Sequence, residues 1–414
     1  MFFCEETCGW IQFVIIMLSL QAHFHEACRN YLRYYFIHIY RETLKIPLNL
    51  NTNKMKKSKI YFGIAFIAVT VLMTLKLIRE NKEETQIIGY YNVENLFDVY
   101  DDPQKRDEDF TPQGKLEWTE AKYEAKLDNI AQVISEIAKD NGGQFHTILG
   151  LGEIENRAVL EDLVRETAIK KANYKIIHIE GPDRRGIDPA LLYRPDQFKP
   201  KETISIPYNF DTKKVTFEMS MEEQTEFRTR DVLMVRGYIG KEHFAFYVAH
   251  LPSRYGGKGG DLRCRGAEII YNHSMELMAQ YPEIKIAVLG DMNDDPTDAS
   301  ISEYLRGKEH LVEVTEDDYF SPFTSMLKNG YGSLCYRGKW NIFDQILVNK
   351  NLLSDSNKGY VIKEVDNNYG VVFKKPFLLQ QEGDYAGYPF RAFIRGQYVD
   401  GYSDHLPTYI ILEK

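Results

Sequence analysis

Short apolar runs rich in β-branched and aromatic residues recur through residues 86–412 and constrain the fold more than any other feature. Between them lie two helical stretches, one with a stripe from Leu127 to Ala138 behind the N-cap candidate Thr119, and one over about 261–280. Many strands with few long helices predict packed sheets with helices outside, a single α+β or α/β sandwich. The runs expected to form strands are 87–91, 147–151, 174–179, 189–194, 232–239, 244–249, 285–289, 343–348 and 407–412.

The charge of the chain is unevenly distributed. Residues 1–85 carry 11 Lys+Arg and 7 Asp+Glu, whereas the remaining residues carry 40 and 53, a net charge of −13. An acidic body of this kind lacks the broad basic surface of a tight duplex-DNA binder. It still allows a nucleic-acid substrate, because a metal ion and a local arginine cluster can supply positive charge. Five cysteines exclude a disulfide scaffold, and we expect Cys264 and Cys335 to be separate thiols.

Residues 55–85 have the pattern of an export signal or an N-terminal membrane anchor. An uncharged, mostly apolar run at 60–75 follows Lys56, Lys57 and Lys59. These lysines predict that the body lies on the extracytoplasmic side, and the lack of a small-x-small cleavage site slightly favours a retained anchor. Since such segments normally start a protein, Met55 is the expected initiator, and we expect the atypical extension 1–54 to be either an over-extended start outside the native protein or a poorly ordered extension.

Carboxylates, asparagines and histidines collect where the predicted strands end. Such a cluster could converge at one edge of the sandwich as oxygen ligands and two imidazoles. Hard oxygen ligands favour Mg²⁺ or Mn²⁺ over Zn²⁺, and a hard divalent ion beside His and Asp suits hydrolysis of phosphoesters. The residues concerned are Asn92, Glu94, Glu153, His250, Asp291, Asn293, Asp344, Asp404 and His405.

Two motifs give this cluster a family resemblance. The segments Gly290-Asp291-Met292-Asn293-Asp294 and Ser403-Asp404-His405-Leu406-Pro407 resemble those of the endonuclease/exonuclease/phosphatase superfamily, which includes deoxyribonuclease I. The resemblance spans about Gln86 to Leu412. It implies a four-layer α/β/β/α sandwich, in which two packed and mostly antiparallel sheets lie between outer helices, with a metal site at one edge.

The resemblance also implies roles for the residues at the strand ends. Asn92, Glu153 and Asp404 would bind the metal, and Asp291 would orient or deprotonate the attacking water. Asn293 would hold a phosphate oxygen. His405 would contact the phosphate, with Asp404 beside this histidine and Asp344 as the partner that orients it. His250 would be a second catalytic histidine, at a position where abasic-site enzymes have tyrosine.

Two basic loops are candidates for holding the phosphate. They contribute Arg184 and Arg185 in one loop and Ser253 and Arg254 in the other. The alternative for each arginine is a solvated surface position. The segment from 385 to 402, rich in glycine and aromatic residues, forms either a wall of the cleft that sets selectivity or a self-packed loop.

The leading functional expectation is an exported or membrane-anchored phosphodiesterase that depends on Mg²⁺, with Mn²⁺ as the alternative metal, and specifically an endonuclease-like enzyme acting on DNA or RNA. One alternative is the same chemistry on a lipid or inositol phosphate. A second alternative is a non-catalytic binding module. The intact set of strand-end residues argues against that module, because a dead copy would be free to lose some of them.

Overall fold

The computed structural model describes residues 84–414 except 255–256, 258 and 354–358. The extension 1–54 and the apolar run at 60–75 therefore lie outside the described residues. Among the helices of the described part, none is both long and apolar enough to span a bilayer.

The first large sheet contains both ends of the described chain. Its central strand β1 pairs antiparallel with β18 on one side and parallel with β2 on the other. The pairing order is β14-β18-β1-β2-β4-β3, and β15 also pairs with β18. The strands are β1 (Thr85–Leu96), β2 (Ile148–Ile154), β3 (Lys175–His178), β4 (Asp188–Tyr193), β14 (Val361–Ile362), β15 (Val371–Val372) and β18 (Thr408–Glu413).

The second large sheet comes from the middle of the chain. Its order is β5-β6-β7-β8-β13-β10-β9, with β7 and β8 parallel and β8 and β13 antiparallel. The strands are β5 (Phe198–Ile206), β6 (Val232–Ile239), β7 (Glu242–His250), β8 (Lys285–Asp291), β9 (Gly307–Lys308), β10 (Tyr319–Phe320) and β13 (Asp344–Asn349).

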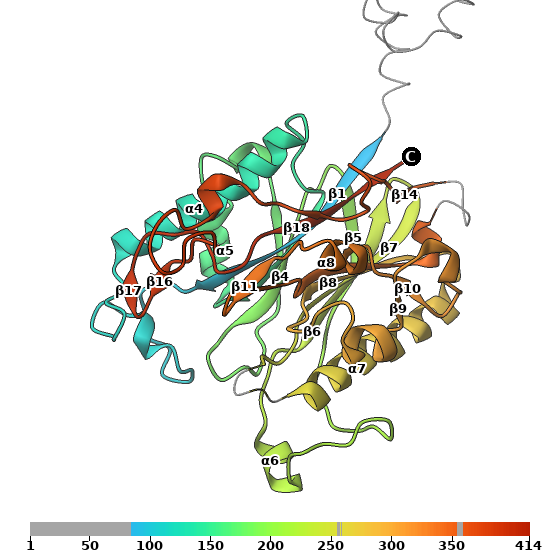
Figure 1. Ribbon diagram of the computed structural model, residues 1–414, viewed down its shortest axis with the longest axis horizontal. Helices are drawn as coiled ribbons and strands as arrows, with labels where there is room; N and C mark the ends of the chain where they lie inside the picture. The colour runs from blue at the N-terminus through green and yellow to red at the C-terminus, as the bar shows by residue number, and fades with distance from the viewer. Residues whose placement is uncertain (1–83, 255–256, 258, 354–358) are drawn as a thin grey trace, which may run out of the picture. The chain divides into compact units, whose positions relative to one another are not determined.

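Alternation of apolar residues in the second sheet shows how the layers stack. Phe246 and Val248 of β7 join the same buried cluster as β1, β2 and β4, whereas Tyr247 and Ala249 face a second cluster with Ile270 of α7. Because successive side chains of a strand point to opposite faces, one face packs on the first sheet and the other on a helix. The expected sandwich of two packed, mostly antiparallel sheets is confirmed (Figure 1).

The two long helices form where helical spacing predicted them. Thr119 precedes α4 (Glu120–Asp140), whose buried stripe includes Ile130 and Ile134 and joins the first sheet's cluster. The second, α7 (Gly260–Gln280), packs on the second sheet. The shorter helices are α5 (Arg157–Leu163), α6 (Met221–Glu226), α8 (Phe323–Lys328), a π-helical turn η4 (Ser300–Tyr304) and the 3₁₀ turns η1 (Glu108–Phe110), η2 (Lys170–Ala172), η5 (Leu311–Glu313), η6 (Lys350–Leu352) and η7 (Pro376–Leu378).

Several short strands were not predicted. Besides β5 and the two-residue strands, the structure contains two hairpins, β11 (Leu334–Tyr336) with β12 (Lys339–Asn341), and β16 (Phe393–Ile394) with β17 (Gln397–Tyr398). Their runs are short and partly exposed, so they lack the apolar signal of a core strand. As expected, Cys264 and Cys335 are free thiols.

Candidate active site

Irregular strand ends in the first sheet place Asn92 and Glu153. The register of β1 against β2 shifts between Asn92 and Leu96, and Glu153 has a left-handed backbone with φ of 64°. Glu94 and Asn95 are also left-handed, with φ of 53° and 56°. Non-glycine residues rarely adopt this region, and the strain is tolerated mainly where function requires it. The bulged ends therefore direct polar groups toward the open edge.

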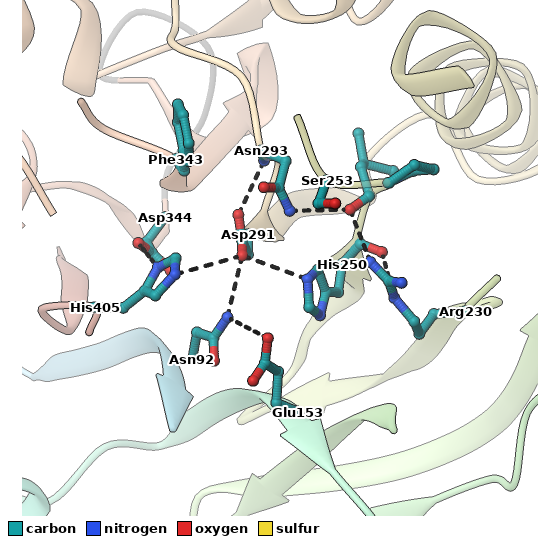
Figure 2. A network of polar contacts seen from close by, with 12 residues as sticks. Asn92, Glu153, Arg230, His250, Ser253, Asp291, Asn293, Phe343, Asp344 and His405 are labelled. Atoms are coloured by element: carbon teal, nitrogen blue, oxygen red, sulfur yellow. Dashed lines mark hydrogen bonds and ion pairs between the residues drawn. The ribbon is translucent and has the colours of Figure 1, made fainter. Parts of the chain in front are cut away.

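Asp291, at the end of β8, is the centre of the polar network (Figure 2). Its Oδ2 accepts from Asn92 Nδ2 at 3.1 Å, and its Oδ1 accepts from the Asn293 amide at 2.9 Å. Asn92 Nδ2 also lies 3.5 Å from Glu153 Oε1. The amide of Asn92 thus links carboxylates from the two sheets, and Asn293 Nδ2 is bound to the Leu251 carbonyl at 3.0 Å.

On one side of Asp291 lies His405, from the loop before β18. Its Nδ1 is 2.7 Å from Asp344 Oδ2, and its Nε2 is 3.9 Å from Asp291 Oδ2. The Ser333 hydroxyl donates to the same Asp344 oxygen at 2.6 Å, and Asp344 is fully buried. Burial disfavours a charged imidazole here, but Asp344 and Asp291 raise the pKa of His405 well above its ordinary value.

On the other side lies His250, the last residue of β7. Its Nε2 is 3.5 Å from Asp291 Oδ2. Burial lowers the pKa of His250 well below its ordinary value, and the nearby Arg230 and Arg185 lower it further. The buried Arg230 donates to the carbonyls of His250 and Leu251 at 3.2 and 2.9 Å, so it fixes this loop.

The pKa of the buried Asp291 carboxyl lies well above that of an ordinary aspartate. Burial raises the pKa of Asp291 to about 7, although the nearby His405 lowers this pKa. A carboxyl with this pKa suits removal of a proton from water, since a general base works best when its pKa is near the working pH.

The donor set fits a hard divalent metal ion. Glu153 is partly exposed, and its two oxygens are held by Asn92 and by the Asn95 amide at 2.9 Å. Asp291, Asp344 and His405 also offer three ligand atoms within 4.8 Å of one another. Because Asp344 and His405 Nδ1 are already bound to each other, we favour Glu153 as the main ligand. Asn92 turns its Nδ2 toward this site, since its Oδ1 accepts from the Glu94 amide at 3.0 Å, and it would ligate a metal only with its side-chain amide rotated.

The predicted arginines fall into two groups. Arg185 is exposed but close enough to His250 to affect its pKa, whereas Arg184 donates to the Glu226 carbonyl at 2.6 Å. Arg254 donates to Asp294 and to the Asn293 carbonyl at 2.7 Å, and Ser253 is exposed beside it. Arg184 and Arg254 are thus engaged with protein groups, and their phosphate-binding roles stay predictions.

Asp404 belongs to a charged cluster that includes residues absent from the predicted site. Arg391 contacts Glu94 Oε1 at 3.0 Å and Asp404 Oδ2 at 3.1 Å, and Asp404 Oδ1 lies 3.9 Å from His405 Nε2. Burial and Asp404 raise the pKa of Glu94 to about 7, although Lys126 and Arg391 lower it. The position of Glu94, two residues after Asn92, could indicate from the sequence that it belongs to the site. No local sequence pattern indicates that Arg391, Lys126 or Arg230 does.

Several solved structures resemble this chain at low sequence identity. A humanised TDP2 from D. rerio has 12% identity and a TM-score of 0.44, covering 80% of this chain and 99% of that one. A truncated TDP2 from Caenorhabditis elegans has 14% identity and a TM-score of 0.45, with coverages of 80% and 98%. A mannosyl-6-phosphatase from Bacteroides thetaiotaomicron has 15% identity and a TM-score of 0.46, with coverages of 79% and 99%.

Sequence comparison is more decisive than these distant similarities. No curated protein sequence matches the chain. A family profile, however, matches residues 87–414, from the first residues of β1 to the end of the chain, and so spans both sheets and every site residue described above. The chain therefore belongs to the endonuclease/exonuclease/phosphatase family, whose members hydrolyse phosphoesters with a divalent metal ion.

Proposed function

We propose that this protein is a divalent-metal-dependent phosphodiesterase acting on nucleic acid, an endonuclease-like enzyme for DNA or RNA. The observation that carries the proposal is the position of Asp291 between His405 and His250, 3.9 and 3.5 Å from their Nε2 atoms, at the edge that also presents Glu153. A carboxylate base, an imidazolium donor and hard oxygen ligands together suit attack of water on a phosphate.

Each residue has a distinct part in this reaction. Asp291 holds and deprotonates the attacking water, and Asn293 faces the phosphate from the adjacent loop. His405, held by Asp344, donates a charged hydrogen bond to the phosphate, where negative charge grows in the transition state. Mg²⁺ or Mn²⁺ bound by Glu153, and by Asn92 with its side-chain amide rotated, would neutralise part of that charge.

We also propose that the enzyme is exported or membrane-anchored, with its catalytic part on the extracytoplasmic side. The support is the basic stretch at 56–59 followed by the apolar run at 60–75. Protease added to intact cells should then remove the catalytic part. Protection of the full-length chain would contradict this location.

The function can be tested by incubating the full chain with Mg²⁺ or Mn²⁺ and a panel of single- and double-stranded DNA, RNA, sphingomyelin and phosphoinositides. We expect cleavage of nucleic acid that stops in EDTA. Glu153→Gln should abolish nearly all cleavage, with partial recovery at high Mg²⁺ if binding is merely weakened. Hydrolysis of a lipid alone would replace the nuclease by the lipid phosphodiesterase, and inactivity on the whole panel would favour the binding module.

Glu155 provides a matched control two residues further along the chain. Its Oε2 accepts from the Asp98 amide at 2.6 Å, and burial raises the pKa of Glu155 to about 8. Glu155→Gln makes the same replacement of side-chain atoms outside the site and should leave metal dependence unaltered. An equal loss of activity in both variants would mean that damage to the fold, not loss of a metal ligand, inactivates Glu153→Gln.

A further inference from the structure

The hairpin β11–β12 is attached at its base to the catalytic edge. Leu334 forms an antiparallel bridge with His405, and the Leu406 amide donates to the Ser333 carbonyl at 2.7 Å. The Ser333 hydroxyl in turn donates to Asp344. The hairpin and the histidine–aspartate pair therefore form one connected unit.

The tip of this hairpin exposes an aromatic ring and two cations. Tyr336 is 62% exposed, and the Arg337 guanidinium lies 5.2 Å from its ring centre. Lys339 is exposed over 72% of its side chain, with Asp295 at 3.7 Å. Arg337 and Gly338 have φ of 48° and 79°, as a tight two-residue hairpin turn requires, so the tip has a defined shape.

The register of the hairpin sets the side to which Tyr336 points. Residues directly opposite in an antiparallel pair share a face, so Leu334 lies on the same face as His405. Tyr336, two residues further along β11, shares that face at a distance of about 7 Å. Phosphates of one strand advance about 3.4 Å per nucleotide along a helix axis, so the rise from Leu334 to Tyr336 corresponds to roughly two nucleotide steps.

We propose that the hairpin tip binds the nucleic-acid strand beside the cleaved bond and makes the enzyme prefer single-stranded substrate. Tyr336 stacks on an unpaired base, and Arg337 and Lys339 contact the flanking phosphates. In a duplex the bases are already paired and stacked, so exposing one to the ring costs free energy. The net charge of −13 on residues 86–414 gives little general attraction to a duplex that could offset that cost. This inference rests on the proposed nuclease function.

The test compares three substrates in the full chain with Mg²⁺: a labelled single-stranded oligonucleotide, its blunt duplex, and the small diester bis(4-nitrophenyl) phosphate, which is too short to reach the hairpin tip. We expect Tyr336→Ala to lower kcat/KM on the single strand by about 5- to 100-fold, the usual effect of losing one stacked base. The loss on the duplex should be smaller, and activity on the small diester should change less than twofold. Tyr336→Phe should retain single-strand activity, since it keeps the ring.

Tyr281 gives a matched control, because Arg236 lies 5.0 Å from its ring and Tyr281 precedes β8 at the end opposite Asp291. Tyr281→Ala should leave the ratio of single-strand to duplex cleavage unchanged. An unchanged ratio in Tyr336→Ala, or an equal loss on the small diester, would overturn the hairpin proposal while leaving the nuclease assignment intact. A wild-type protein that cleaves the small diester but no nucleic acid would instead refute the proposed function.

Discussion

His405 and His250 flank the same carboxylate, yet their surroundings shift their pKa values in opposite directions. His405 comes from the loop before β18 and lies against Asp344, which raises its pKa. His250 comes from the second sheet and is held in a loop tied by Arg230, so its pKa falls. Burial alone would make both neutral, so the partner decides which one is charged. The comparison shows how one site obtains a strong charged donor and a neutral hydrogen-bonding group from the same residue type.

The largest expected effect comes from removing the charged histidine. His405→Ala should lower kcat by roughly 10²- to 10⁴-fold, the usual range for a charge-stabilising or acid–base group. His405 is buried, and alanine would leave Asp344 without its imidazole partner, so stability should fall as well. His405→Asn keeps a hydrogen-bond donor near Asp344, so it should be more stable than His405→Ala. Equal losses of kcat in these two variants would show that the loss comes from catalysis and not from reduced stability.

The next effect tests whether Asp344 acts through His405. Asp344→Asn should lower kcat by roughly 10- to 100-fold, since a hydrogen bond to a charged group is replaced by a neutral one. The double variant with His405→Ala should be about as slow as His405→Ala alone, because residues that act as one unit are not additive. Multiplicative losses, measured as kcat in the four proteins of the cycle, would show that the two residues work independently.

Removing the neutral histidine should cost less. His250→Gln replaces one neutral hydrogen-bonding group by another, so we expect kcat to fall only about 2- to 10-fold. A loss as large as that of His405→Ala would mean that His250 also acts as a charged donor and would remove the distinction drawn above. Steady-state rates on the small diester are the suitable measurement, because they exclude effects on strand binding.

A third histidine, His146, shows how burial shifts the pKa of an imidazole that has no charged partner. Burial lowers the pKa of His146 to about 3, whereas an unfolded histidine titrates near 6.5. The unfolded state therefore binds the proton first, and the contribution of neutral His146 to stability is present above pH 6.5 and is lost as the pH falls toward 3. Between pH 7 and pH 5 this loss amounts to about 2 kcal/mol.

Denaturant unfolding of the wild type and of His146→Asn at pH 7 and pH 5 measures this contribution. The asparagine variant does not titrate, so it should lose less stability over this range, and the carboxyls common to both proteins cancel in the difference. Equal losses in the two proteins would show that His146 is protonated in the folded state.

The long helices and central strands could be predicted from the sequence, whereas the hairpin β11–β12 could not. Helical spacing located α4 and α7, and the apolar runs located the central strands, because a buried face needs a regular pattern of apolar residues. The hairpin β11–β12 escaped prediction because its strands are short and half-exposed. Its position follows from pairing with His405, a contact between residues 71 positions apart.

The sequence by itself determined the sandwich and the identity of the candidate polar residues. Strand periodicity is local, and the motifs at Asp291 and at Asp404-His405 are contiguous, so both can be read along the chain. Only the tertiary structure decided that Asp344 lies 2.7 Å from His405, that Arg230 ties the His250 loop, and that Arg391 joins Glu94 to Asp404. Charge states depend on burial and on neighbours from distant strands, and these are fixed only when the two sheets pack together.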